Sequence, residues 1–211
     1  MDNILELLRS YDAFLEGHFI LSSGLHSRYY IQCAQVLQHP KVANKLANYA
    51  KELFLSHCKN VYPTVIVSPA LGGIIWGYEL ARAFSQNNNT ATNDDDEAVR
   101  AIFAERDPNT GNMTLRRNFA IYPTDKVIIA EDVITTGLST NEVINIVKNF
   151  TEEILSIICI VDRSSGVKLK LDADVPIISL AKISIENYTQ EDCPLCKQNI
   201  PLVKPGSRRR T

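Results

Sequence analysis

The sequence of 211 residues lacks three features, and each absence excludes a class of protein. No apolar run approaches the roughly 18 residues of a membrane-spanning helix, so we expect no membrane partner. Its 22 basic and 24 acidic side chains leave a net charge of -2, so no overall field attracts nucleic acid, and we expect none as a partner. The first six residues carry acids where a secretory signal carries lysines, so we expect a cytoplasmic protein.

Cysteine is also scarce, and only Cys193 and Cys196, among five, have the spacing of a metal or redox pair. A structural zinc site needs four ligands, and no second Cys-x-x-Cys or His-x-x-x-His lies nearby. We therefore expect a surface turn with two reduced thiols and keep metal or redox function as the alternative. Cys159 lies in an apolar run, where a thiol acts as a small hydrophobic side chain.

Short apolar runs alternate with helical patterns along most of the chain. The runs predict strands at 65–67, 101–104, 119–122, 127–130, 157–161 and 175–180, and the patterns predict helices at 40–54, 74–84 and 140–150. Continuous apolar runs are typical of strands covered on both faces, and intervening helices favour parallel pairing. The sequence thus predicts an α/β fold with a doubly wound sheet, whose ligands collect beyond the carboxyl ends of the strands.

The two ends of the chain and one internal segment do not follow this alternation of strands and helices. Helical spacing over residues 4–15 is followed by β-like segments at 19–21 and 29–31, joined by a turn. Residues 86–98 hold an Asn- and Asp-rich stretch with almost no apolar side chain, which predicts a disordered insertion. The three arginines at 208–210 are expected to be solvated.

The most informative stretch runs from a buried strand into Glu131 and Asp132, then a Thr-Thr-Gly turn and a helix start. The backbone amides of residues 135–139 would converge at the N-terminus of that helix, where the helix dipole favours a phosphate. Gly137 permits the left-handed backbone of such a turn. Ser139 and Glu142 have the spacing of a capping box.

The two adjacent acids indicate what else the ligand carries. Carboxylates repel a nearby phosphate unless they bind hydroxyl groups or a divalent cation. A phosphate with vicinal hydroxyls one sugar length away satisfies both demands, and this describes a ribose 5-phosphate. The alternative for Glu131 and Asp132 is an ordinary solvated strand end.

This stretch resembles the phosphoribosyl diphosphate motif of the type I phosphoribosyltransferases, and further blocks are similar to the orotate phosphoribosyltransferase family. The blocks lie in family order at 19–30, 68–77, 103–106, 113–117, 193–196 and 200–207, so the resemblance covers most of the chain. It implies a Rossmann-like, mostly parallel sheet flanked by helices. It also implies one domain over residues 1–211, with a small hood formed by residues 1–40 and the C-terminal segment.

The resemblance further implies an activity and its partners. The family transfers the phosphoribosyl group of 5-phosphoribosyl 1-diphosphate to orotate, giving orotidine 5′-phosphate and pyrophosphate in pyrimidine biosynthesis. Magnesium is the expected cofactor, held mainly by the substrate with no direct protein ligand, and a homodimer is the expected assembly. The alternatives are a phosphoribosyltransferase for another base and a regulatory protein that senses phosphoribosyl diphosphate.

Residue roles follow from the same resemblance. Glu131 and Asp132 are the expected catalytic pair on the ribose hydroxyls. The phosphoribosyl diphosphate site is completed by Val133, Ile134, Thr135, Thr136, Gly137, Leu138 and Ser139. Thr135 and Arg163 are expected to contact orotate, whose carboxylate suits the fork of a guanidinium. The alternative for Arg163 is a surface residue after a strand.

Two other segments are candidates for the pyrophosphate. The turn Ala70, Leu71, Gly72 and Gly73 follows a strand, and tight packing is its alternative explanation. The segment 106–117 is a candidate closing loop in which Arg106 is a candidate catalytic residue. Many family members carry Lys and His there, whereas this chain has neither between 101 and 117, and arginines act as anion clamps rather than titrating acids. The sequence leaves His26 open between a structural and a functional role.

Overall fold

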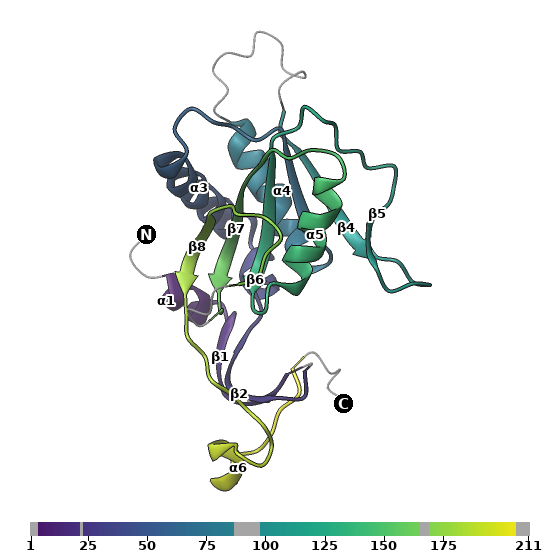
Figure 1. Cartoon of the computed structure of the whole chain (residues 1–211). Helices are drawn as coiled ribbons and strands as arrows, with labels where there is room; N and C mark the ends of the chain where they lie inside the picture. Colours follow the sequence, from purple (N-terminus) through teal and green to yellow (C-terminus); the bar gives the residue numbers. More distant parts are fainter. Residues whose placement is uncertain (1–3, 22, 87–97, 165–168, 206–211) are drawn as a thin grey trace.

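The computed structural model describes residues 4–21, 23–86, 98–164 and 169–205 and contains two sheets (Figure 1). The larger sheet has six strands in the order β5-β4-β3-β6-β7-β8, with helices on both faces, and the smaller has the order β1-β2-β9. The tail at 208–210 and most of the predicted insertion at 86–98 lie outside the described residues.

The larger sheet confirms the predicted fold class. Its parallel strands are β3 (Val65–Pro69), β4 (Arg100–Arg106), β6 (Val127–Ile134), β7 (Ile154–Asp162) and β8 (Ile177–Lys182), and β5 (Met113–Leu115) runs antiparallel to β4 at one edge. Every residue of β3 is buried, as expected for a strand covered on both faces. The carboxyl ends of β3, β6 and β7 therefore lie at one edge, where a ligand site is expected.

Alternating residues of the strands pack against different helices, because successive side chains point to opposite faces. On one face Ile66 and Ile128 join α3 (Pro40–His57) and α4 (Gly72–Ser85) in one apolar cluster. On the other face Val67 and Ile129 pack with α5 (Leu138–Lys148). None of the helices in the described ranges is both long and apolar enough to span a bilayer.

The smaller sheet contains strands from both ends of the chain, and its N-terminal hairpin confirms the small N-terminal hood of the expected fold class. It contains β1 (Phe14–Ile20), β2 (His26–Ile31) and β9 (Asn187–Tyr188), and is accompanied by the short helices α1 (Ile4–Ser10), α2 (Ala34–Leu37) and α6 (Pro194–Lys197). Val203 forms a parallel bridge with Phe19, so the C-terminal segment also lies along β1. We call β1, β2, β9 and residues 193–203 the hood.

Two sequence predictions of local structure are wrong. The N-terminal helix ends at Ser10 instead of near residue 15, because Asp12 adopts a φ of 54° and the chain turns into β1. The strand expected at 119–122 does not form, because Arg117 and Asn118 both have positive φ and direct the chain away from β5. Phe119 instead packs edge-on against Phe103, with ring centroids 5.1 Å apart.

Candidate functional site

The junction of β6 and α5 forms the centre of the site. β6 carries Glu131 and Asp132 near its carboxyl end, and α5 begins at Leu138, immediately after Gly137. Gly137 has a φ of 76°, a left-handed conformation that disfavours any residue with a Cβ atom. The first amides of α5 have no carbonyl partner within the helix, so the turn presents donors and the positive end of the helix dipole.

Glu131 is buried, with only 6% of its surface exposed. The hydroxyl of Ser139 donates to its Oε2 at 2.8 Å, and the hydroxyl of Thr140 lies 3.4 Å from the same oxygen. Burial raises the pKa of Glu131 to about 8, and the neighbouring charge of Asp132 also raises it. A solvated strand end is therefore excluded for Glu131.

The predicted capping box is wrong, because both of its side chains have other partners. Ser139 donates to Glu131, and the carboxylate of Glu142 accepts two hydrogen bonds from Arg106. Gly137 occupies the N-cap position and makes no side-chain cap. Ser139 therefore positions the carboxylate of Glu131 instead of capping α5.

Asp132 lies beside the start of α4. Its carboxylate is half-buried, and burial raises its pKa. A Cβ atom at Gly72 would lie 2.7 Å from both carboxylate oxygens, so only glycine lets the helix start come this close. Asp132 is thus enclosed by its neighbours on one side.

The turn from Ala70 to Gly73 is the second strand-to-helix turn at this edge. A Cβ atom at Gly73 would lie 3.0 Å from the carbonyl oxygen of Ala130, so tight packing accounts for both glycines. The same packing brings the turn beside Asp132. The peptide bond between Ala70 and Leu71 is cis, and the side chain of Leu71 is 83% exposed.

Arg163 follows β7 and lies next to the end of β6. Its backbone N–H donates to the carbonyl oxygen of Ile134 at 2.8 Å, which places Arg163 beside Thr135 in the adjacent turn. The side chain is half-buried, and burial lowers the pKa of its guanidinium. The structure thus brings both predicted orotate contacts to the same strand ends as the acids, with the Thr135 side chain exposed.

The expected closing loop is a hairpin formed by β4 and β5. Arg106, at the end of β4, forms a two-point ion pair with Glu142 of α5, at N···O distances of 3.0 and 2.6 Å. Arg116 and Arg117 both pair with Glu105, at 3.8 and 3.2 Å. Each of these three candidate anion clamps is therefore paired with a carboxylate in this conformation.

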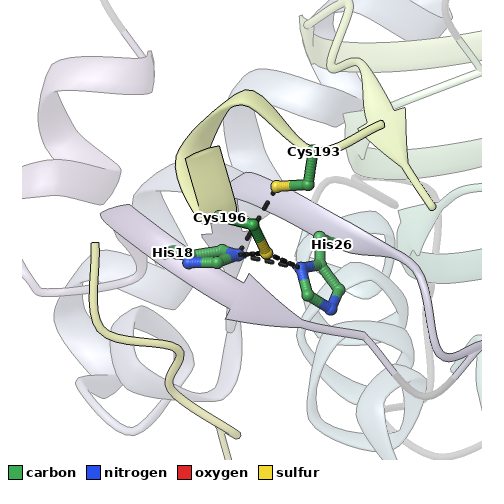
Figure 2. A group of neighbouring side chains, drawn as sticks. All are labelled: His18, His26, Cys193 and Cys196. Atoms are coloured by element: carbon green, nitrogen blue, oxygen red, sulfur yellow. Dashed lines mark hydrogen bonds between the residues drawn. The ribbon is translucent and has the colours of Figure 1, made fainter. Parts of the chain in front are cut away.

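A second cluster, in the hood, was not predicted from the sequence (Figure 2). His18, His26, Cys193 and Cys196 point toward one another, and the expected exposed turn is wrong for Cys193, which is completely buried. The two histidines lie eight positions apart on the two sides of a hairpin turn. That spacing becomes informative only once the hairpin is known.

Comparisons with known proteins agree with this geometry. The Phosphoribosyl transferase domain family matches residues 32–193. The orotate phosphoribosyltransferase of Caldicellulosiruptor bescii is 42% identical over 209 residues, covering 99% of this chain and 98% of the relative. That of Carboxydothermus hydrogenoformans is 42% identical over 207 residues, covering 98% of each chain.

Solved structures show the same fold at lower identity. Orotate phosphoribosyltransferase from Aeropyrum pernix has a TM-score of 0.63 and 22% identity, covering 86% of this chain and 94% of its own. Adenine phosphoribosyltransferase from Rhodothermus marinus has a TM-score of 0.61 and 19% identity, covering 85% of this chain and 98% of its own. The fold is therefore shared by enzymes named for different bases.

Proposed function

This chain belongs to the type I phosphoribosyltransferases and, within them, to the orotate phosphoribosyltransferases, and on that premise we propose its reaction. It transfers the phosphoribosyl group of 5-phosphoribosyl 1-diphosphate to a ring nitrogen of orotate, releasing pyrophosphate and orotidine 5′-phosphate for pyrimidine biosynthesis. The observation that carries the proposal is the buried acid pair of β6, set directly before the amide-lined turn that starts α5.

Glu131 and Asp132 bind the ribose hydroxyls, and residues 135–139 surround the 5-phosphate. The carboxylate of Glu131 is held by Ser139, so it is already oriented before a sugar arrives. The exposed hydroxyls of Thr135 and Thr136 and the free amides of the turn suit a phosphate. The ribose hydroxyls thus meet the two acids at the end of β6, and the phosphate meets the hydroxyls and amides of the turn that follows.

Magnesium fits this edge of the sheet. Two carboxyl groups whose pKa values are raised by burial lie together there, so a cation close by would stabilise their ionised forms. Mg²⁺ prefers oxygen ligands and keeps most of its water or phosphate ligands in protein sites. We therefore assign the ion to the pyrophosphate oxygens with no direct protein ligand; when bound, it offsets charge on the leaving group.

Thr135 and Arg163 bind orotate, and the turn Ala70, Leu71, Gly72 and Gly73 faces the pyrophosphate. A guanidinium forms two parallel hydrogen bonds with a carboxylate, which is the group that distinguishes orotate from other pyrimidines. Arg106 reaches the pyrophosphate only after its ion pair with Glu142 opens.

Catalysis by these groups is electrostatic. As pyrophosphate departs, the ribose becomes a cation that the carboxylates of Glu131 and Asp132 stabilise, while half-buried Arg163 holds the acceptor base in place. Exclusion of water protects the cation from hydrolysis.

The test is the loss of orotate absorbance with phosphoribosyl diphosphate, with and without magnesium. We expect Asp132→Asn and Arg163→Ala to lower kcat/KM by about a hundredfold, the usual cost of an oriented charge. Arg28→Ala is the matched control, because Arg28 pairs with Glu16 on the exposed surface. Full activity in both site variants would contradict the assignment.

A panel of bases separates the alternatives. A phosphoribosyltransferase for another base would turn over adenine or another purine, but not orotate. A sensor would bind phosphoribosyl diphosphate and turn over no base. The 42% identity to two orotate phosphoribosyltransferases supports orotate over both.

We also propose a single domain over residues 1–211, a homodimer and a cytoplasmic location. A second copy is supported by an exposed apolar stripe along α4 and its N-cap, formed by Leu71, Ile75 and Tyr78. Their spacing of four and three positions places them on one face of the helix. The five free cysteines are compatible with a reducing compartment.

A further inference from the structure

Four side chains from both ends of the chain meet in the hood, and they have no role in the proposed reaction. His18 comes from β1, His26 from the start of β2, and Cys193 and Cys196 from α6 and its N-cap (Figure 2). Their ligand atoms all lie within 4.8 Å of one another. His18, His26 and Cys193 are each at most 2% exposed, so solvent does not separate them.

The distances match those around a tetrahedral zinc ion. Sulfur and nitrogen ligands about 2.3 and 2.05 Å from a tetrahedral Zn²⁺ lie about 3.6 Å apart. Here the Sγ–Nε2 distances from Cys193 and Cys196 to His18 are 3.5 and 3.7 Å, and Cys196 Sγ lies 3.3 Å from Nδ1 of His26. The two ring nitrogens, 2.9 Å apart, need to separate by only about 0.4 Å to bind the ion.

The tautomer of His18 directs a lone pair into the cluster. Its Nδ1 lies 2.8 Å from the carbonyl oxygen of Ile200, and because a carbonyl only accepts, Nδ1 carries the proton. In the neutral ring, which is the form that ligates a metal, Nε2 then offers a single lone pair, and His26, Cys193 and Cys196 all approach it within hydrogen-bonding distance. A metal ion satisfies all four groups at once, and the bond to Ile200 is the outer contact that ligating histidines usually make.

Phe14 and Ile31 of the β1–β2 hairpin belong to the main apolar cluster, but the part of the hood around α6 lies outside it. Neither of the two apolar clusters found among the described residues includes Phe19, Cys193 or Leu195. The helix α6 has four residues, and β9 has two. Small units without a sufficient apolar core commonly depend on a disulfide or a structural metal, and these cysteines are free.

We propose that His18, His26, Cys193 and Cys196 bind one structural Zn²⁺ that fastens residues 193–203 to the β1–β2 hairpin. Two thiolates and two imidazoles form the closed donor set of structural zinc sites, whereas magnesium requires oxygen ligands. The site is therefore chemically distinct from the magnesium proposed for the reaction. It also stands or falls independently of the proposed function.

The first experiment measures the metal content of the purified full-length protein after growth with zinc. We expect about one Zn per chain in the wild type and in Cys58→Ser, whose half-buried thiol at the end of α3 lies outside the cluster. We expect Cys193→Ser and Cys196→Ser each to lower zinc content or zinc affinity by about tenfold or more. Equal zinc in all four proteins would overturn the proposal.

The second experiment uses the wild type alone, so it remains decisive if the cysteine variants fail to fold. The metal is removed with a chelator and replaced with Co²⁺, whose visible absorption reports tetrahedral thiolate coordination. We expect this spectrum at one equivalent, and its loss when Zn²⁺ is added. A wild-type protein that binds neither ion, or a Cys193–Cys196 disulfide in place of metal, would overturn the proposal.

Discussion

At the residue scale, burial of Glu131 favours the protonated carboxyl, whereas its proposed function uses the ionised carboxylate. Its pKa is raised from 4.5 to about 8, chiefly by burial, so the ligand-free native protein keeps a proton that the unfolded chain loses near pH 4.5. The native state then binds more protons than the unfolded state between these two values. The free energy of unfolding therefore falls as pH rises from about 4.5 to 8.

The variant Glu131→Gln removes this titration while keeping an acceptor for Ser139. We expect its Tm to rise relative to that of the wild type between pH 5 and pH 8, because only the wild type loses stability there as Glu131 ionises. Each kcal/mol of difference in the free energy of unfolding corresponds to roughly 2–4 °C in a protein of this size. Thermal unfolding at several pH values without ligand measures the difference, with Glu16→Gln as an exposed control. If the Tm values of Glu131→Gln and the wild type changed with pH in parallel, ionisation of Glu131 would not destabilise the native state.

Sequence reasoning could predict these acids but not their partners. Two carboxylates before a Thr-Thr-Gly turn stand out in the chain, because their chemistry constrains the ligand. The choice of Ser139 between capping a helix and holding Glu131 depends on a tertiary contact that local spacing does not encode. For the same reason His18 gave no signal, since the other side chains of its cluster lie up to 178 positions away.

At the element scale, the buried parallel strands were predictable because each is a continuous apolar run. The first residues of β1 were not, since they extend a helical pattern and burial along the strand alternates irregularly across a bulge between Glu16 and Phe19. The apolar run at 119–122 was misread as a strand, because burial of Ile121 and the edge-on contact of Phe119 with Phe103 occur here without strand pairing. Composition predicts that such residues are covered, but not which element covers them.

The ion pair between the β4–β5 hairpin and α5 is a testable link between two elements. Arg106 is 48% exposed in its side chain and Glu142 is 29% exposed, so we expect a coupling energy of only about 0.2–1 kcal/mol in a double-mutant cycle. The two single variants should differ in activity, because Arg106 and not Glu142 is proposed to bind the pyrophosphate. We expect Arg106→Ala to lower kcat by about tenfold or more and Glu142→Ala to preserve it.

Steady-state kinetics and thermal unfolding of both single variants and the double variant measure this. Equal losses of activity in Arg106→Ala and Glu142→Ala would mean that the ion pair acts as one structural unit. In that case Arg106 would not be a catalytic residue. Arg117→Ala is a useful comparison, since Arg117 pairs with Glu105 in the same hairpin.

At the scale of the whole molecule, the apolar stripe on α4 predicts the assembly. Tyr78 is 60% exposed, and a charge within a covered apolar patch opposes association. We expect the wild type to have twice the chain mass in light scattering and Tyr78→Asp to shift toward a single chain. Phe150→Asp is the control, because Phe150 is also an exposed aromatic residue but lies after α5 and outside the stripe; it should keep the mass of the wild type. A monomeric wild type would exclude the dimer.

The hood joins residues of β1 to residues that are synthesised much later. His18 and Cys193 are 175 positions apart, and Val203 can lie along β1 only after the intervening chain has been made. The larger sheet has all its strands by Lys182, so the ribosome has made them before it makes the later segment of the hood. Closure of the hood therefore follows synthesis of the larger sheet, and a chain released a few residues after Lys182 would lack both cysteines that meet His18.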